Sequence, residues 1–200
     1  DLRANGDRKN PALACGAGAA VYVTRSSFFG NQAATGGGLH AACEASLSNA
    51  TFANNTATVG SGGVHGTAKL GVLQCTFAGN KAPASPAIGS EGPLTLKNTL
   101  VAGVAKDVPA CTAKVLLASV QNLVEDGSCN ATLKGPVSLA ASLQSCGVTQ
   151  TWALLGGSPA VDAGDAGVCS ALPVGGVDGC GVARPNGLGC DIGAAEWTGP

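Results

Sequence analysis

Charged side chains are scarce in this sequence. Asp, Glu, Lys and Arg together make up 12% of the 200 residues, and the formal net charge is −1. This composition supplies no basic patch for nucleic-acid binding and does not favour long helices with charged outer faces. Aromatic residues are scarce as well, at 4%, so a core must be built mainly from Val, Leu and Ala. The 45% content of hydrophobic residues nevertheless argues against disorder.

Histidine occurs only twice, and the nine cysteines include no Cys-x-x-Cys pair. These absences argue against a zinc site, and we expect neither a metal nor a cofactor. Nine cysteines instead predict disulfides in an oxidising, extracellular compartment, with at most one thiol unpaired. We expect Cys111 to pair with Cys129, because the two bracket strand-like stretches. The disulfide candidates are Cys43, Cys75, Cys111, Cys129, Cys169, Cys180 and Cys190.

No signal peptide or membrane-spanning run is visible in the sequence. We therefore expect Asp1 to be a processed end or the start of a fragment, and we expect no membrane insertion by this segment. Three Asn-x-Thr sequons, at Asn49, Asn54 and Asn130, are candidates for glycosylation of a secreted protein.

Acidic residues are nearly absent from the middle of the chain. Between Ser26 and Lys106 the only acids are Glu44 and Glu91. Hydrolysis of a polysaccharide needs paired carboxylates, and lyase chemistry needs a base and usually calcium-binding acids. We therefore predict no catalytic residues in this chain, unless acids outside it complete a site.

A repeat runs from Ser26 to Gly89. The segment Ser27–Ala33 (SFFGNQA) returns as Thr51–Ala57 (TFANNTA) and again as Thr76–Ala82 (TFAGNKA). Each copy leads into a run of small residues closed by an aliphatic side chain. A fixed period in the twenties with Gly-rich turns indicates a solenoid, in which each unit buries its apolar face against its neighbours.

The content of each repeat identifies the kind of solenoid. Short apolar runs such as Ala20–Val23 are separated by Gly, Asn, Ser and Thr, which is typical of strands with sharp corners. We predict an all-β, right-handed parallel β-helix, the hand following from the preferred chirality of parallel strand connections. The predicted ladders are an interior column of Phe28, Phe52, Phe77 and Leu100, and an amide ladder of Asn31, Asn55 and Asn80 at one corner.

The composition divides the chain into three parts. Residues 1–15 are predicted to be an irregular lead-in segment, residues 16–155 to form the coils, and residues 156–200 to form a C-terminal cap rich in Cys, Asp and Gly. An open solenoid end exposes unpaired strand edges. We therefore expect upstream chain or another protein subunit to cover the N-terminal end.

Two groups of side chains are candidates for chemistry. The repeat aligns His40 with His65, and stacked coils would place them about 5 Å apart. No carboxylate recurs beside either histidine, so we interpret them as a copied surface position and not as a metal site. The second group contains five acids and one arginine, without the spacing of a calcium loop. We interpret it as Asp-capped turns that hold the cap together with the cysteines: Asp162, Asp165, Asp178, Asp191, Glu196 and Arg184.

The C-terminal part also carries a resemblance. Its motifs are GGSPAVDAGD at 156–165, VARP at 182–185 and CDIGAAE at 190–196, preceded by NTLVAG at 98–103 and QNLV at 121–124. In this order they resemble choice-of-anchor Q proteins, secreted proteins with β-helix repeats like those of polymorphic outer membrane proteins. The usual Asp-Gln-Arg-Gly step appears here as DGCG at 178–181, which implies a locally different disulfide. The resemblance implies a pectin-lyase-like fold and a surface location.

These features predict an extracellular, non-catalytic structural or adhesive β-helix module within a larger surface assembly. Its expected partners are other subunits or upstream chain at the N-terminal end, and surface glycans. The alternative is a polysaccharide-binding or polysaccharide-cleaving β-helix protein, and the shortage of acids on the coil faces favours the first prediction.

Overall fold

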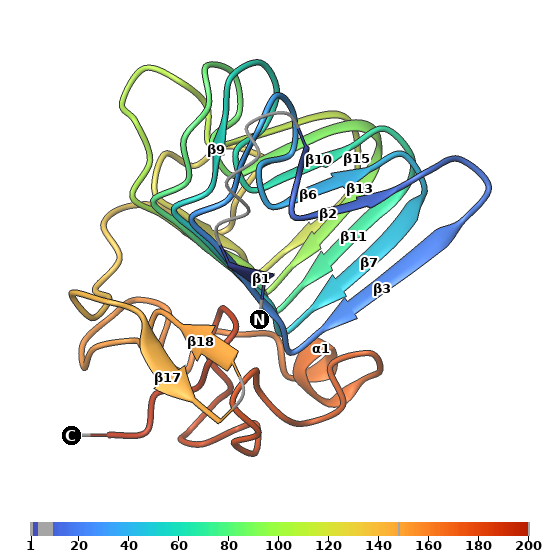
Figure 1. The fold of residues 1–200 in the computed structure, drawn as a ribbon. Coiled ribbons are helices and arrows are strands. Elements are labelled where there is room, and N and C mark those ends of the chain that lie inside the picture. Colours follow the sequence, from blue (N-terminus) through green and yellow to red (C-terminus); the bar gives the residue numbers. More distant parts are fainter. Residues whose placement is uncertain (1, 4–9, 148, 200) are drawn as a thin grey trace.

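The computed structural model describes residues 2–3, 10–147 and 149–199. It shows a parallel β-helix of about five turns with almost no α-helix, as the repeat predicted (Figure 1). In each complete turn the chain crosses an eight-stranded sheet twice and a six-stranded sheet once, as β6 (Leu39–Ala41), β7 (Glu44–Ser48) and β8 (Thr51–Ala53) do.

The two main sheets contain most of the strands. The other strands of the eight-stranded sheet are β2 (Leu13–Cys15), β3 (Ala20–Thr24), β10 (Val64–Gly66), β11 (Leu70–Leu73), β13 (Ile88–Lys97) and β15 (Cys111–Val120). The others of the six-stranded sheet are β1 (Leu2–Arg3), β4 (Ser27–Phe29), β12 (Thr76–Ala78), β14 (Leu100–Ala102) and β16 (Leu123–Val124). The remaining elements are the parallel pair β5 (Gln32–Ala33) and β9 (Thr56–Ala57), the antiparallel pair β17 (Gln144–Cys146) and β18 (Thr149–Thr151), and α1 (Ala166–Ser170).

The phenylalanine column is confirmed, and its rings stack face to face. Phe28 pairs with Phe52 and Phe52 with Phe77, with ring centroids 4.6 and 4.9 Å apart. The next member is Val101, so the prediction of Leu100 was wrong by one residue. Successive strand residues face opposite sides of a sheet, and here both sides are buried. Leu100 therefore faces outward into a second apolar cluster formed with the C-terminal section, where it lies with Ile192.

The predicted amide ladder is also present, at the corner that follows the strands of the phenylalanine column. Asn31 donates through Nδ2 to Oδ1 of Asn55 at 3.0 Å, and Asn55 donates likewise to Asn80 at 3.1 Å. Asn80 then donates to the carbonyl of Phe52 at 2.8 Å. All three asparagines are buried, so the ladder satisfies polar groups that would otherwise destabilise the coil interior.

A second column of mainly polar residues, which the sequence did not predict, lies at the turn between the two main sheets. The turn between the two main sheets always contains one residue in the left-handed region, with φ between 43° and 52°. These residues are Arg25, Asn49, Gln74, Asn98 and Gln121. Four of the five carry an amide, and those four make hydrogen bonds to the C-terminal section. We call these four, Asn49, Gln74, Asn98 and Gln121, the outer amide column.

Both ends of the predicted coil region need correction. The lead-in segment 1–15 is not irregular throughout, because β1 pairs with β4 and β2 pairs with β6 in parallel register. At the other end, the last parallel contact of the stack joins Leu123 to Leu133. The described chain beyond Leu133 runs back beside the coils, so the C-terminal cap covers the flank of the stack and not its end (Figure 1).

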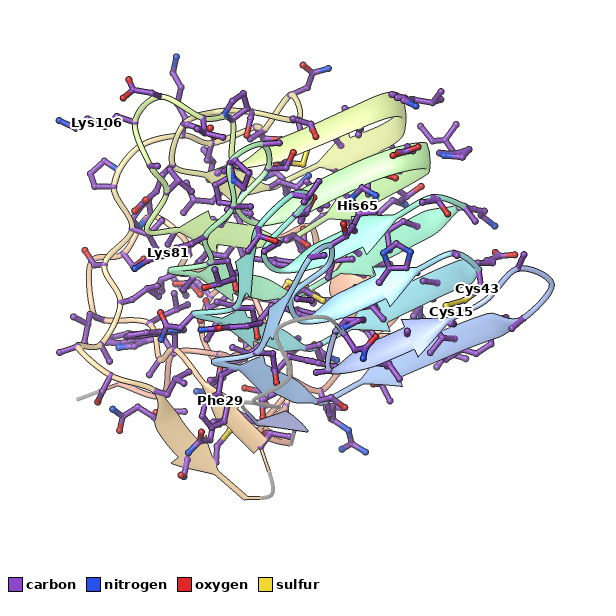
Figure 2. All side chains as sticks on the ribbon, turned by 45° about the horizontal axis from the view of Figure 1, so that its top comes forward. Cys15, Phe29, Cys43, His65, Lys81 and Lys106 are labelled. Carbon is purple, nitrogen blue, oxygen red and sulfur yellow. A yellow bond between two sulfur atoms is a disulfide. The ribbon has the colours of Figure 1, made fainter. Side chains whose placement is uncertain are left out.

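Four disulfides connect eight of the nine cysteines. Cys111 pairs with Cys129, as predicted, and Cys169 pairs with Cys190 inside the C-terminal section. Cys43 bonds to Cys15 (Figure 2), and Cys180 bonds to Cys146; Cys15 and Cys146 were not among the predicted disulfide candidates.

Cys75 was wrongly predicted to form a disulfide. It lies in the coil interior and pairs by position with Ala50 below and Thr99 above, so neither adjacent turn offers a sulfur. Burial raises the pKa of the Cys75 thiol to about 12, which suppresses the reactive thiolate.

This arrangement gives a prediction for thiol labelling. In the native protein, iodoacetamide at pH 8 should label no cysteine on the described part of the chain. After denaturation without reductant, mass spectrometry should find one labelled residue, Cys75. Prior reduction is the positive control, since it should expose the other eight cysteines. Rapid labelling of Cys75 in the native state, or labelling of several cysteines without reductant, would contradict the assignment.

Candidate functional site

The acids of the C-terminal section form a structural cluster around a buried ion pair. Arg184 contacts Glu196 through Nη1, and their side chains are 0% and 1% exposed. Arg184 also donates to the carbonyls of Asp191 and Gly193 and to Oδ1 of Asn49. Burial lowers the pKa of Arg184, while Glu196, Asp178 and Asp191 oppose this by attraction. The side chains of this cluster therefore bond mainly to one another and to nearby backbone groups, which is the arrangement of a structural core.

The aspartates hold turns, as the sequence indicated. Asp178 accepts from the backbone N–H groups of Cys180, Val182 and Glu196. Asp191 accepts from Asp162 and Trp197, and burial raises its pKa to about 6. Two further carboxylates do the same: Asp162 accepts from Gly189 at 2.8 Å, and Asp165 caps α1 by accepting from Val168 at 2.9 Å.

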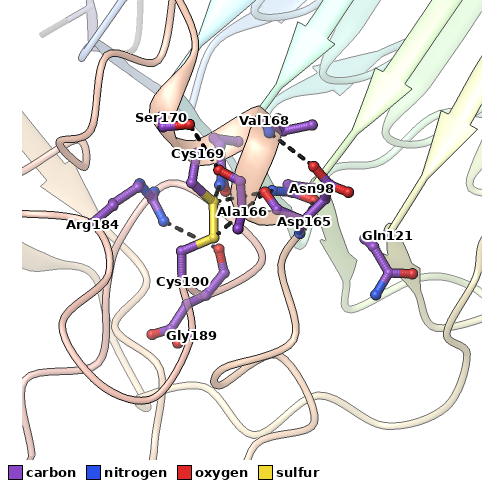
Figure 3. Close-up of a disulfide and its surroundings, with 12 residues drawn as sticks. Asn98, Gln121, Asp165, Ala166, Val168, Cys169, Ser170, Arg184, Gly189 and Cys190 are labelled. Atoms are coloured by element: carbon purple, nitrogen blue, oxygen red, sulfur yellow. Dashed lines mark hydrogen bonds between the residues drawn. A yellow bond between two sulfur atoms is a disulfide. The ribbon is translucent and has the colours of Figure 1, made fainter.

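The outer amide column attaches this section to the coils, and Figure 3 shows two of its members, Asn98 and Gln121. Asn98 exchanges two hydrogen bonds with the backbone of Asp165, at 2.9 and 3.0 Å. Gln121 donates to the carbonyl of Ala163. Gln74 is oriented by its partners to donate to the carbonyls of Asp191 and Gly193. Side-chain amides thus replace the strand pairing that an irregular segment cannot supply.

Asn49 belongs to the same column, and this corrects its assignment as a glycosylation candidate. It is 2% exposed, donates to the carbonyl of Val177 at 3.0 Å and accepts from Arg184. A glycan on this nitrogen would break contacts between the coils and the C-terminal section. Asn54 and Asn130, by contrast, are exposed and remain candidates.

The other candidate site is a pocket of about 490 Å³ on the outer face of the eight-stranded sheet. We call it the outer-face pocket. Its floor and walls come from β10, β13 and β15 and from the loops before β6, β10 and β13. The polar residues that line it are Thr35, Ser61, His65, Ser85, Ser90, Glu91, Thr112 and Lys114.

A missing side chain explains why the pocket lies here. The parallel register places His40, His65, Gly89 and Thr112 one above another on the outer face. At Gly89 this column has no side chain, so a gap opens between His65 and Thr112. An added Cβ at Gly89 would lie only 2.0 Å from Oγ of Ser61 and 3.4 Å from Nδ1 of His65. The hydroxyl of Ser61 therefore occupies the gap directly beside the imidazole.

His65 lies between a hydroxyl and a carboxylate. Its Nδ1 is 3.4 Å from Oγ of Ser61, and its Nε2 is 3.6 Å from Oε1 of Glu91. The other carboxylate oxygen of Glu91 is 3.4 Å from Nζ of Lys114. The His65 side chain is 14% exposed, whereas those of Glu91 and Lys114 are about half or more exposed. Figure 2 shows His65 on the outer side of the sheet.

The electrostatics keep His65 uncharged near neutral pH. Burial lowers the pKa of His65, and a charge on His40 lowers it further, while Glu91 raises it by attraction and hydrogen bonding. The net direction is downward from the ordinary value of 6.5. A neutral imidazole can accept a proton at one ring nitrogen while it donates at the other.

The sequence predicted the histidine stack but not its surroundings. The rings of His40 and His65 are stacked with centroids 5.5 Å apart. No carboxylate recurs with the repeat, as the sequence indicated, but one lies near His65: Glu91 follows Gly89 by two residues and so faces the same side of β13. Ser61 and Lys114 were missed too. All three neighbours of His65 could have been found by extending the register of the repeat from Gly89 to the residues around it.

Comparisons with known protein families, with curated proteins and with solved structures return no match. Among the described residues, no helix is long and apolar enough to cross a membrane. Nor do three or more His, Cys, Asp or Glu side chains come together there as a metal-binding group. The pocket must therefore be interpreted from its own chemistry.

Proposed function

We propose that this chain is an extracellular structural and adhesive β-helix module of a larger surface assembly, and that it adheres by holding a carbohydrate residue in the outer-face pocket. The observation that carries the proposal is the composition of that pocket. Glu91 accepts hydrogen bonds, Lys114 donates them, and Ser85 and Thr112 can do either. Sugar hydroxyl groups both donate and accept, so they match such a set.

The rim of the pocket supports the same ligand class. Val59 lines the pocket and is 67% exposed, which gives an apolar surface for the C–H face of a sugar ring. A partly open pocket with a few convergent polar groups is typical of small-ligand sites.

The scaffold supports an extracellular and mechanical role. Four disulfides suggest an oxidising, extracellular-type environment. Stacked Phe and Asn columns support the register of the coils, and parallel pairing joins β10, β13 and β15, which carry the pocket residues, side by side. The resemblance of the C-terminal motifs to choice-of-anchor Q proteins also supports a surface location.

The proposal predicts binding that depends on Glu91. On an immobilised panel of neutral and acidic polysaccharides, the wild-type protein should be retained by at least one. Glu91→Gln should weaken that retention at least about tenfold, because charge-assisted hydrogen bonds are roughly twice as strong as neutral ones. Glu44→Gln is the matched control, since Glu44 is an exposed acid paired with Lys69 on the same sheet, outside the pocket.

Two outcomes would oppose carbohydrate binding in this pocket. One is that no polysaccharide retains the wild-type protein. The other is that Glu91→Gln and Glu44→Gln are both retained as well as the wild type, which would place adhesion elsewhere on the surface.

A further inference from the structure

We propose that Ser61, His65 and Glu91 form a hydrolytic centre that removes a small acyl group, such as acetyl, from an ester. Ser61 is the nucleophile, His65 the general base and acid, and Glu91 a positioning residue for the imidazole. The inference rests in one respect on the proposed function: a carbohydrate held in the outer-face pocket would carry the ester as an O-acylated hydroxyl.

The order of the three groups is the main argument. Oγ of Ser61 is 3.4 Å from one ring nitrogen of His65, and the carboxylate of Glu91 is 3.6 Å from the other. A hydroxyl, an imidazole and a carboxylate in this sequence are the elements of a Ser-His-acid triad, which is recognised by geometry and not by chain order. Both contacts are longer than in a bound complex, as is common in ligand-free sites.

The repeat shows that this grouping is local to one turn. In the preceding turn the position of Ser61 is taken by Gly36, so His40 has no equivalent serine. In the next turn Ser85 is present, but Gly89 replaces the histidine. Of these three turns, only the one with Ser61 and His65 has both a serine and a histidine at the two positions. In that turn the neighbouring Gly89 leaves room for the serine hydroxyl. A position merely copied with the repeat would not require this combination.

The surroundings suit the chemistry of a neutral base. Burial and His40 lower the pKa of His65, so Nδ1 can accept the serine proton at neutral pH while Nε2–H faces Glu91. Ser61 is 2% exposed and lies at the pocket floor, where solvent competes little for its hydroxyl. The hydroxyl of Thr112, which lies 2.6 Å from Oγ of Ser85, and the ammonium of Lys114, which pairs with Glu91, line the same pocket, and either would donate to a negatively charged oxygen by exchanging its present partner.

The reaction balances with water as the only co-reactant. Oγ of Ser61 bonds to the ester carbonyl carbon while its proton passes to Nδ1 of His65. The tetrahedral intermediate then breaks the bond to the alcohol oxygen, which takes that proton and leaves. A water molecule adds to the acyl-serine, again giving a proton to His65. Breakage of the Oγ–acyl bond returns this proton to Ser61 and releases the carboxylic acid.

The test uses p-nitrophenyl acetate and a fluorophosphonate probe on the intact chain. Wild-type protein should hydrolyse the ester, and mass spectrometry should place the phosphonate on Ser61. Ser61→Ala should lower kcat/KM about 10³-fold or more. Ser46→Ala, on the outer side of β7 and outside the pocket, should have the wild-type rate and the same melting temperature.

The pH profile distinguishes a base from a packing residue. His65 is faced by His40 from β6, by Glu91 from β13 and, through Glu91, by Lys114 from β15. Replacing His40 by Asn removes a charge that lowers the pKa of His65. The acidic limb of the kcat/KM profile should therefore move to higher pH in His40→Asn, whereas a merely structural His65 would leave the profile unchanged.

Each failure has a separate meaning. Equal hydrolysis by wild type and Ser61→Ala, or phosphonate found on another residue, would overturn the triad. Absence of both hydrolysis and labelling would overturn it too, and the carbohydrate proposal would stand if the wild type were still retained by a polysaccharide. Retention of Ser61→Ala on that polysaccharide, together with loss of hydrolysis, would support both proposals.

Discussion

Replacing Phe52 by alanine is expected to lower the free energy of unfolding by about 3–5 kcal/mol, the usual loss for truncating a buried aromatic side chain. Phe52 is fully buried, and its ring lies between those of Phe28 and Phe77 at 4.6 and 4.9 Å. Removing it leaves a cavity in the middle of the column and exposes one face of each neighbouring ring to that cavity. The backbone cannot close the gap, because its register is fixed on both sides by parallel strands.

Chemical denaturation, monitored by circular dichroism, would measure this loss of unfolding free energy. Tyr22→Ala is the control, since Tyr22 is also aromatic and on a coil strand but is 78% exposed. Its midpoint should stay close to that of the wild type. Equal destabilisation by the two substitutions would mean that the Phe column is not the core of the coils.

The second large effect is expected at the buried ion pair of the C-terminal section. Arg184→Met should destabilise the protein by about 3–5 kcal/mol, because it leaves the carboxylate of Glu196 buried without its counter-charge. The substitution also removes donors to Asn49 and to the carbonyls of Asp191 and Gly193. The C-terminal section should therefore detach from the flank before the coils unfold.

A double variant separates the two causes. Adding Glu196→Gln to Arg184→Met removes the unpaired charge and should restore part of the stability. Lys69→Met, which breaks the exposed pair with Glu44, should leave the denaturation midpoint unchanged. Hydrogen exchange would show where unfolding begins: early exchange confined to the section after residue 150 fits this account. Simultaneous exchange of the coils would contradict it.

The parts of the fold that could be read from the sequence are those that repeat. Phe52, Asn55 and their equivalents recur at a near-constant step, and stacking turns that step directly into columns. Leu100 was misplaced because the sequence could not show that both faces of β14 are buried. The face it occupies is covered by residues near Ile192, and that contact joins segments far apart in the chain.

The candidate site was harder to predict because it arises where the repeat fails. His40 and His65 were visible as a copied pair, but the pocket depends on Gly89 having no side chain and on Ser61 entering the space. The disulfides show the same limit. Cys111–Cys129 lies within one region of the coils, whereas Cys146–Cys180 depends on the path of an irregular section.

The most direct test of this account compares two glycine variants in the same sheet. In Gly89→Ala the new Cβ would lie 2.0 Å from Oγ of Ser61, whereas in Gly71→Ala the nearest atom would be 3.6 Å away, an ordinary contact. With both variants shown to be folded, polysaccharide retention should be measured alongside the wild type. We expect Gly71→Ala to be retained like the wild type and Gly89→Ala to lose retention. If Gly89→Ala were retained as well as the wild type, the gap at Gly89 would not be the functional site.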